Sequence, residues 1–443
     1  MSLYLLPKDS NHGKRPGACL VLALFALALS PLTPATAQIA HHRPGTAVVP
    51  HSSEAQPNDA GRVLHTNVRF VYMNGSSPSE LPPFAGYGYE TPASFACLYK
   101  LARPVTGCNP NLTTTNSPGG SQAIAIVDAY DDPNAAADLA FFSSQFGLPY
   151  SDSNFKVVYA EGPQPPEDPT GGWEFEETLD IEYAHAMAPN AKIYLVEANS
   201  NYDSDLFPAI LVASNLVSCG STSTCPKGSK GKGQVSMSFA GAEFAQEASL
   251  DSFFTTPNVE YFGAAGDSPG VEYPCASPNV ICVGGTSTAR SEFTGNLIAE
   301  IAWSDAGGGI SSYEPIPRYQ ATYPGLNGQL QGFRGVPDVS ADANLNTGAW
   351  VWDTFPYGAD AETGWFIAGG TSLATPLTAG IFNATGSFGT SSNGELSEIY
   401  SLRSFGSFRD ITYGACGYYS GSFSSPGWDL CTGFGSPAGL DLR

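Results

Sequence analysis

Ser372 lies in GGTSLATP, residues 369–376, where a glycine-rich turn leads into a helical pattern. The first turn of a helix has free backbone N–H groups and a dipole that favour negative charge developing nearby. A serine in this position suits nucleophilic attack on a carbonyl carbon, and Pro376 should lie in the first turn of the helix. An ordinary N-cap serine, which needs no chemistry, fits the same local sequence.

A nucleophilic serine needs a group that accepts its proton, yet from residue 66 onward the only histidine is His185. The sequence predicts a helix over residues 173–189, WEFEETLDIEYAHAMAP. At 100° per residue, Glu176 and Asp180 fall within its apolar arc, the side expected to face the core. Glu177 and His185 fall outside this arc, so His185 is a poor candidate for the base.

Two carboxylates one helical turn apart repel each other by a few tenths of a kcal/mol in water. On a buried face the cost rises, unless one carboxylate is protonated or both bind something. A solvated acidic face is the ordinary interpretation of such a charge run, but these two positions face the predicted core. We therefore expect Glu176 and Asp180 to be functional.

Three separated motifs together resemble the sedolisins, serine-carboxyl peptidases that are related to subtilisin and work in acid. The motifs are Glu176-x-x-x-Asp180, Asp267 in AAGDS after a predicted strand, and Ser372 in GGTSLATP. The resemblance covers about residues 86–443. It implies that Glu176 replaces histidine as general base, that Asp180 shares its proton, and that Asp267 lines the oxyanion hole.

Acidic conditions suit these implied roles. A carboxylate base with a pKa near 4–5 works where an imidazole would already be charged. Asp267 must be protonated to donate a hydrogen bond to an oxyanion. On the local sequence alone, Asp267 in GDSP is equally well explained as a turn residue.

Two departures from the family pattern concern the substrate cleft and maturation. The family's S-x-S-W-G stretch reads SMSFA at residues 236–240, so Phe239 replaces an aromatic residue that shapes the cleft. Instead of a long folded prodomain, only residues 38–85 separate the predicted leader from the peptidase domain. We interpret residues 38–85 as a linker or short pro-segment, and residues 86–443 as the sedolisin-type peptidase domain.

A calcium site is predicted near the C-terminus, where Asp410 and Asp429 lie in glycine-rich loops. Calcium takes six to eight oxygen ligands, although aspartate in turns is more often a turn-former. The family resemblance implies one Ca²⁺ held by these two side chains and by the backbone carbonyls of Ile411, Ser425 and Gly427.

The N-terminus is predicted to be a secretory signal peptide, residues 1–37. Basic residues precede the apolar run ACLVLALFALAL at residues 18–29, and an A-x-A cleavage site follows at residues 35–37. Twelve apolar residues are too few for a membrane span, which needs roughly 20. We therefore expect a secreted protein without a membrane anchor.

Cysteine usage agrees with export. Of nine cysteines, Cys19 lies in the leader, and the other eight form close sequential pairs. We expect these pairs to be disulfides, and the near absence of histidine disfavours zinc. The expected pairs are Cys97–Cys108, Cys219–Cys225, Cys275–Cys282 and Cys416–Cys431.

Alternating apolar strands and helices predict an α/β fold with a parallel sheet covered on both faces. The family resemblance makes this a subtilisin-like three-layer fold, a mostly parallel central sheet flanked by helices. The predicted strands are 122–130, 155–161, 192–198, 234–240, 259–267 and 280–287. The predicted helices are 134–147, 173–189, 205–217, 245–256 and the one that follows residue 370.

Charge limits the partners that the chain can bind. With 41 acidic and 19 basic residues, the net charge of −22 argues against nucleic-acid binding and against docking on anionic membranes. We expect a monomer that acts on protein or peptide substrates as an acid endopeptidase. The alternatives are a tripeptidyl exopeptidase, a non-catalytic secreted binding protein on the same scaffold, and a Ser-His-Asp protease that uses His185.

Overall fold

The computed structural model describes residues 46–73, 88–218, 231–358, 361–401, 406–417 and 422–440. All of them belong to one compact unit, residues 39–443. The predicted signal peptide and the predicted Cys219–Cys225 pair lie outside the described residues. Among the residues described, no helix combines the length and apolarity needed to cross a bilayer.

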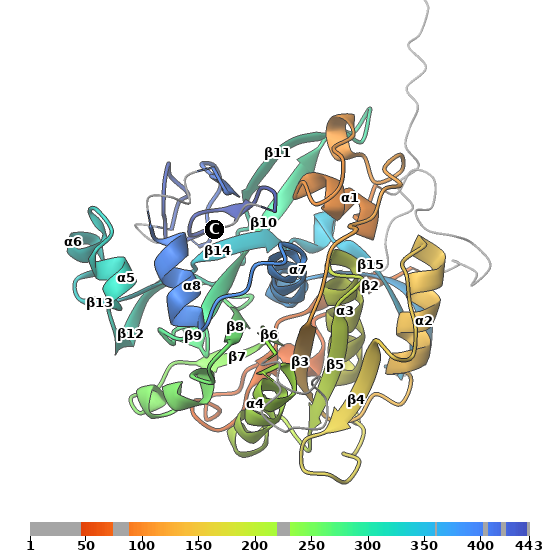
Figure 1. Cartoon of the computed structure of the whole chain (residues 1–443), viewed down its shortest axis with the longest axis horizontal. Coiled ribbons are helices and arrows are strands. Elements are labelled where there is room, and N and C mark those ends of the chain that lie inside the picture. Colours follow the sequence, from red (N-terminus) through yellow and green to blue (C-terminus); the bar gives the residue numbers. More distant parts are fainter. Residues whose placement is uncertain are drawn as a thin grey trace, which may run out of the picture. The chain divides into compact units, whose positions relative to one another are not determined.

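A central eight-stranded sheet organises this unit, with the order β11-β10-β8-β6-β3-β5-β4 and with β14 paired to β10 (Figure 1). Every pair is parallel except β10 with β11, which is antiparallel. This arrangement confirms the predicted α/β fold class. The strands are β3 (Ala123–Ala129), β4 (Phe155–Tyr159), β5 (Lys192–Ala198), β6 (Gly233–Met237), β8 (Val259–Ala264), β10 (Ile281–Arg290), β11 (Leu297–Ala302) and β14 (Val339–Asp342).

Helices cover both faces of the sheet. Along β3, Ala125 and Val127 join the apolar cluster that contains α4, whereas Ile124 and Ile126 join the cluster that contains residues of α2 and α3. Side chains alternate between the faces of a strand, so α4 lies on one face and α2 with α3 on the other. These helices and the nucleophile helix are α2 (Ala135–Phe146), α3 (Gly172–Met187), α4 (Asp203–Ser218) and α7 (Thr371–Ala384).

Helix α3 is buried on all sides, and not only along its apolar arc. Glu177 and His185, which the helical wheel places outside that arc, are 0% and 2% exposed. The reason is that α3 is enclosed by α2, α7, β3 and β15 (Ala349–Tyr357), so no face remains for solvent. A helical wheel identifies the face toward the sheet but cannot show which other elements cover the remainder.

Smaller sheets and short helices complete the fold. Residues 46–73, expected as part of a linker or pro-segment, contribute β1 and β2 to two of these sheets. The small sheets contain β15, β16 (Glu362–Gly369) and β2 (Arg69–Tyr72); β1 (His65–Thr66), β7 (Phe239–Ala242) and β9 (Glu272–Tyr273); β12 (Gly309–Pro315) and β13 (Phe333–Val336); and β17 (Phe408–Arg409) and β18 (Ser436–Pro437). The remaining α-helices are α1 (Pro92–Leu98), α5 (Arg318–Ala321), α6 (Leu326–Leu330) and α8 (Ser392–Ile399).

The helix predicted over residues 245–256 is wrong. This stretch forms two short 3₁₀ helices, η3 (Glu247–Ser249) and η4 (Asp251–Phe254). Within these two helices, only Glu247 and Phe254 are buried. Most helical stability in proteins comes from packing an apolar face, and these turns have no continuous apolar stripe to pack.

Three of the four expected disulfides are confirmed: Cys97–Cys108, Cys275–Cys282 and Cys416–Cys431.

Candidate active site

Ser372 is the second residue of α7, so the N-cap interpretation is wrong. The N-cap is Gly370, whose φ of 111° is a conformation that L side chains rarely adopt. The Ser372 N–H belongs to the first turn, where backbone donors have no intrahelical acceptor. It donates instead to the carbonyl oxygen of Asn67 at 3.1 Å.

Pro376 is the sixth residue of α7, not part of its first turn as predicted. Because proline has no N–H, the carbonyl oxygen of Ser372 loses the partner that it would have four residues along the helix. The Ser238 hydroxyl lies 3.4 Å from that carbonyl oxygen. The proline therefore leaves the Ser372 carbonyl oxygen free to contact the Ser238 hydroxyl at the end of β6.

Helices α3 and α7 pack against each other closely enough to bring the carboxylates to the serine. A Cβ built on Gly380 of α7 would lie only 2.8 Å from the Ala184 carbonyl oxygen and the Met187 Cβ of α3. Glycine thus allows an approach that a larger residue would prevent. Glu176, Asp180 and Ser372 are all 0% exposed at this helix–helix contact.

Glu176 is a buried carboxyl next to the nucleophile. Burial raises its pKa well above the ordinary value and the charges of Asp180 and Asp128 raise it further, while the Ser372 hydroxyl opposes the shift. In this arrangement neither Glu176 oxygen accepts a hydrogen bond from a described residue. The Ser372 hydroxyl instead donates to the Ser238 carbonyl oxygen at 3.1 Å.

Asp180 is held by Ser238, whose Oγ lies 2.7 and 2.9 Å from the two carboxylate oxygens. Burial raises the pKa of Asp180 well above its ordinary value, and the hydrogen bond from Ser238 opposes this shift. Burial also raises the pKa of Asp128, a fully buried carboxyl near the end of β3, and the Asp180 charge adds to that shift.

Sequence reasoning missed Ser238 and Asp128 as members of the site. Ser238 lies in the SMSFA stretch, which drew attention only through Phe239. Asp128 interrupts an apolar strand near its carboxyl end, which is where catalytic groups gather in parallel sheets. The position of Asp128 in its strand was the one sequence signal that could have placed this residue in the site.

Asp267 follows β8 and faces the start of α7, as expected for an oxyanion donor. Its Oδ1 accepts hydrogen bonds from the Thr371 N–H at 2.7 Å and from the Thr371 hydroxyl at 3.0 Å. Burial raises the pKa of Asp267 to about 7, against the opposing effects of Thr371 and of Arg69. Below that pH the carboxyl carries a proton that it can donate to a developing oxyanion.

Residues 65–69 occupy the cleft beside the serine. The Asn67 N–H donates to Ser372 Oγ at 3.0 Å, and the Asn67 side-chain amide donates to the Ser238 carbonyl oxygen at 3.0 Å. A cavity of about 330 Å³ lies between this segment, β7 and the 267–272 loop, with Asp267 and Glu272 in its wall. Nothing in the local sequence of residues 65–69 predicts this contact.

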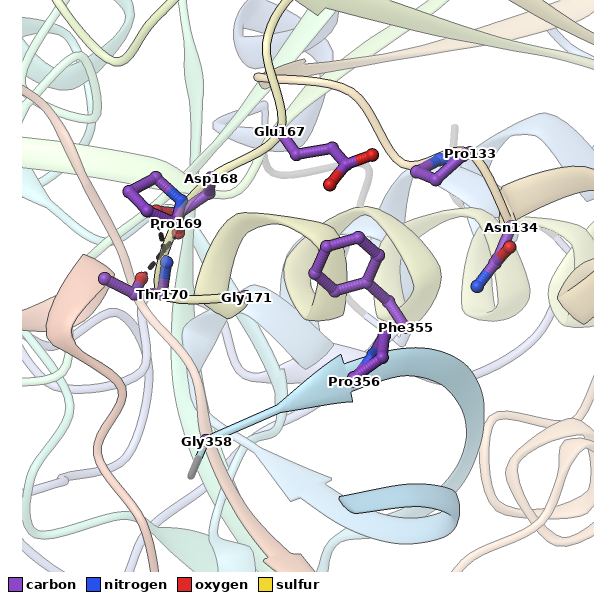
Figure 2. Close-up of a pocket in the computed structure, with 10 residues that line it drawn as sticks. All are labelled: Pro133, Asn134, Glu167, Asp168, Pro169, Thr170, Gly171, Phe355, Pro356 and Gly358. Carbon is purple, nitrogen blue, oxygen red and sulfur yellow. Dashed lines mark hydrogen bonds between the residues drawn. The ribbon is translucent and has the colours of Figure 1, made fainter. Parts of the chain in front are cut away.

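A larger pocket of about 770 Å³ lies at the N-terminal end of α3 (Figure 2). Asp168 in its wall caps the helix, accepting hydrogen bonds from the Gly172 and Trp173 N–H groups at 3.1 and 3.2 Å. None of the four predicted catalytic side chains lines this pocket. The lining residues are Pro133, Asn134, Glu167, Asp168, Pro169, Thr170, Gly171, Phe355, Pro356 and Gly358.

The predicted calcium ligands come together around one loop. Asp410 accepts a hydrogen bond from the Gly427 N–H at 2.9 Å, and Asp429 accepts one from the Ser425 N–H at 2.9 Å. No group of three or more His, Cys, Asp or Glu side chains suited to a metal occurs in the described part of the chain. Two carboxylates and backbone carbonyls are nevertheless a hard oxygen donor set that fits calcium. Ile411 adjoins Asp410 and is buried.

Comparison with known proteins agrees with the geometry of the site. The sequence matches no family model. It is 33% identical to kumamolisin of Bacillus sp. (strain MN-32) over 73% of this chain and 60% of that protein. It is 27% identical to tripeptidyl-peptidase 1 of Dictyostelium discoideum over 74% of this chain and 55% of that protein. The chain thus spans less than two thirds of the length of these curated relatives.

A solved structure shares the fold. Pseudomonas sedolisin, a serine-carboxyl proteinase complexed with two molecules of pseudo-iodotyrostatin, superposes with a TM-score of 0.62 at 23% sequence identity. The alignment covers 79% of this chain and 95% of that chain.

The fold and the site together define a subtilisin-like α/β protein in which buried carboxyls, rather than a histidine, adjoin the serine of the nucleophile helix. In sequence the chain is similar to kumamolisin and sedolisin, which supports its placement in the sedolisin family.

Proposed function

We propose that this protein is a secreted, acid-active endopeptidase that cleaves protein and peptide substrates through an acyl-enzyme on Ser372. The observation that carries the proposal is the meeting of α3 and α7, where Ser372 lies against the buried carboxyl of Glu176. The predicted leader and the disulfides support secretion, because disulfides persist in oxidising compartments.

Glu176 acts as general base in this proposal. It accepts the Ser372 proton as Oγ attacks the scissile carbonyl carbon, and later gives that proton to the leaving amine. Asp180 shares a proton with Glu176, so the two carboxyls titrate as a pair. Ser238 fixes the Asp180 carboxyl in the orientation that this exchange needs.

Asp267 and the Ser372 N–H form the oxyanion hole. Both are fixed before the reaction, because Thr371 holds the Asp267 carboxyl and the helix holds the N–H. Preorganised donors of this kind stabilise the transition state without reorganisation. Since burial raises the pKa of Asp267 to about 7, its donor proton is present across the acidic range.

Histidine chemistry has little support in this site. The His185 ring packs against Tyr150, with ring centroids 6.4 Å apart, on a side of α3 away from α7. Burial lowers the pKa of His185 to about 4. This placement disfavours the Ser-His-Asp alternative.

Endopeptidase activity is favoured over tripeptidyl exopeptidase activity by the path of residues 46–73. An exopeptidase that releases tripeptides has to close its cleft three residues before the scissile bond. Here the chain that reaches Asn67 continues without a break to residue 46 on the amino side, and His65 and Thr66 still pair with β7. The cleft therefore has room for a chain longer than three residues on that side.

Digestion of a denatured protein at pH 3–5, with fragments identified by mass, tests this proposal. We expect cuts at internal bonds by the wild type and none by the Ser372→Ala variant. Release of successive tripeptides would favour the exopeptidase alternative. Full activity of Ser372→Ala would reject the mechanism, and an inert wild type would favour a binding protein on the same scaffold.

One calcium ion is proposed to bind Asp410 and Asp429 together with the carbonyls of Ile411, Ser425 and Gly427. When bound, the ion would tie the C-terminal loops together and contribute stability by mass action. We expect a chelator to lower the melting temperature by a few degrees, corresponding to about 3 kcal/mol at a hundredfold excess of calcium over its Kd. An Asp429→Asn variant should not respond to the chelator, and a wild type that does not respond either would remove the site.

A further inference from the structure

A pocket at the start of helix α3 lies outside the catalytic cleft (Figure 2). Its volume of about 770 Å³ is within the range of roughly 300–1,000 Å³ that is usual for ligand sites. The described residues that line it include neither the four predicted catalytic residues nor residues 65–69, which lie beside Ser372. A ligand can therefore enter this pocket while residues 65–69 occupy the cleft.

The walls of the pocket are fixed before any ligand binds. Three separate segments each contribute a proline, whose ring fixes the backbone φ angle. These are Pro133 before α2, Pro169 before α3 and Pro356 near the end of β15. The Asp168 carboxylate also holds its loop, because it accepts hydrogen bonds from the Thr170 N–H at 3.0 Å and from the Thr170 hydroxyl at 2.7 Å. A preformed site loses less conformational entropy when a ligand binds.

The charged groups of the pocket are negative. Glu167 and Asp168 contribute carboxylates, and none of the described lining residues is basic. The exposed Glu167 carboxylate forms no ion pair with a described residue. Asn134 is the N-cap of α2 but does not use its side chain to cap the helix, so its amide oxygen is available to accept a hydrogen bond. These groups favour a ligand that is positively charged and donates hydrogen bonds.

Phe355 adds an aromatic surface beside these polar groups. Its ring is half-buried and lies over α3, below the Glu167 carboxylate in the view of Figure 2. The face of an aromatic ring attracts a cation that lies within about 6 Å of its centre. A guanidinium group suits this combination, because it stacks on aromatic faces and pairs with a carboxylate through two parallel hydrogen bonds.

We propose that this pocket binds an arginine side chain of a protein substrate, with the guanidinium group between the Glu167 carboxylate and the Phe355 ring. The inference rests on the proposed function, and it names a substrate class: proteins with an arginine a few residues from the scissile bond. Lysine should bind more weakly, because its ammonium group is compact and strongly hydrated. The net charge of −22 also attracts basic substrates to the protein.

The pocket is close enough to the catalytic residues for one substrate to reach both. Gly171 lies in its wall, and Glu176 follows five residues later, about 7.5 Å along the axis of α3 at 1.5 Å per residue. An extended peptide advances about 3.3 Å per residue, so an arginine a few residues from the scissile bond spans this distance. Such remote binding is equal in the ground state and the transition state, and therefore lowers KM without changing kcat.

Binding is tested with N-acetyl-argininamide on the full chain carrying Ser372→Ala, at pH 5.5, where exposed carboxylates are charged. An NMR titration measures Kd, and N-acetyl-citrullinamide, a neutral analogue of nearly the same shape, is the comparison. We expect saturable binding of the arginine probe. The citrulline probe should bind at least about fivefold more weakly, because charge-assisted hydrogen bonds are roughly twice as strong as neutral ones.

Two substitutions in the pocket and one outside it locate the binding. Glu167→Gln and Phe355→Leu should each raise the Kd of the arginine probe about 2- to 5-fold, the size expected for an exposed ion pair and for a cation–π contact. Glu292→Gln is the matched control, because Glu292 is an exposed acid between β10 and β11 and its replacement removes the same charge. This control should leave Kd unchanged. Thermal melts show whether each variant is folded, and if Phe355→Leu is not, Glu167→Gln at an exposed position decides.

Peptide hydrolysis by the wild type tests whether the pocket serves substrates. Each pair of peptides differs only in an arginine or a citrulline, placed at successive positions up to five residues from the scissile bond. We expect arginine at one or more of these positions to lower KM at least about threefold, with kcat unchanged. Glu167→Gln should remove most of this preference, and Glu292→Gln should keep it.

The outcomes separate this inference from the proposed function. Hydrolysis by the wild type without binding of the arginine probe, or without any arginine preference, would overturn the inference and leave the endopeptidase. Equal binding of the two probes, or equal effects of Glu167→Gln and Glu292→Gln, would also overturn it. Arginine binding at Glu167 in a wild type that hydrolyses nothing would reject the proposed function, and the pocket would then bind arginine without serving a substrate.

Discussion

At the scale of single residues, the site has to keep one carboxyl charged and another neutral at the same pH. Glu176 must be able to accept a proton, whereas Asp267 must carry one to act as a donor. Burial and the charges of Asp180 and Asp128 raise the pKa of Glu176, so its base form requires that this group of carboxyls release one proton. Asp267 keeps its proton until the pH approaches about 7. Activity should therefore fall as the pH rises through about 7.

Replacing Asp267 by alanine removes one oxyanion donor and leaves the nucleophile and base in place. We expect kcat to fall about 10²- to 10³-fold at pH 4, with a small change in KM, because the lost interaction strengthens in the transition state. Steady-state kinetics on a peptide substrate measures this. Asp203→Ala is the control, because Asp203 at the start of α4 is a partly buried acid whose pKa is also raised by burial, to about 6. Equal losses in both variants would assign the effect to general destabilisation.

At the scale of elements, the helix pair α3 and α7 sets the distance between base and nucleophile. Gly380 is the point of closest approach, because a Cβ there would lie 2.8 Å from the Ala184 carbonyl oxygen. We expect Gly380→Ala to destabilise the fold by about 1–3 kcal/mol through overpacking. It should also lower kcat about 10- to 100-fold, because a small displacement of α3 moves Glu176 away from Ser372.

Gly328 in α6 provides the matched control for this prediction. A Cβ on Gly328 would meet no atom within 4 Å, so Gly328→Ala should leave activity unchanged and stability equal or slightly higher. Urea unfolding and kinetics on both variants make the comparison. A Gly380→Ala variant with wild-type kcat would show that the spacing of the two helices is not critical.

Elements buried on both faces could be predicted from the sequence, because their apolar runs have no other explanation. Strand β5 lies at residues 192–198, as predicted, and the acid helix begins one residue before and ends two residues before its predicted bounds of 173–189. The prediction of a helix over residues 245–256 was wrong because the composition of this stretch suits a helix but its packing does not. The contact of Asn67 with Ser372 joins residues 305 positions apart, and no local pattern could reveal it.

Within the site, a serine in a glycine-rich turn and two acids on a core-facing arc were visible from spacing alone. The different surroundings of the two Asp267 carboxyl oxygens were not visible from the sequence. They arise because Thr371 donates to one oxygen and Arg69 lies beside the other. The role of Ser238 could not be predicted for a similar reason, because it depends on α3 and α7 both packing near the end of β6. Such roles come from tertiary neighbours and not from the residue's own segment.

At the scale of the whole molecule, buried carboxyls make stability depend on pH. Burial raises the pKa of Asp132 and Asp267 to about 7, of Glu272 to about 8 and of Glu174 to about 9. Ordinary unfolded values lie near 4, so the folded state binds more protons above that pH. The contribution of these groups is fully present below about pH 4 and is lost as the pH rises through the folded pKa values.

We therefore expect the melting temperature to be highest near pH 4–5 and to fall by roughly 10 °C by pH 8. His185 opposes this trend, since its pKa is lowered to about 4 and its contribution is lost as the pH falls from about 6.5 through 4. Because one histidine opposes several carboxyls, it reduces the expected fall of the melting temperature with rising pH but does not reverse it. Thermal scans of Ser372→Ala, which avoids self-digestion, measure it. A maximum at pH 7 or above would contradict the assignment of these buried acids.

The most direct test of the central claim is the initial rate of peptide hydrolysis at pH 4 by a folded Glu176→Gln variant, with His185→Ala beside it. If a carboxyl does the work of imidazole, the glutamine variant should lose about 10³-fold in kcat/KM, because general acid–base catalysis typically contributes about 10²- to 10⁴-fold. His185→Ala should keep wild-type activity. A Glu176→Gln variant within about tenfold of the wild type, or an inactive but folded His185→Ala, would contradict the account.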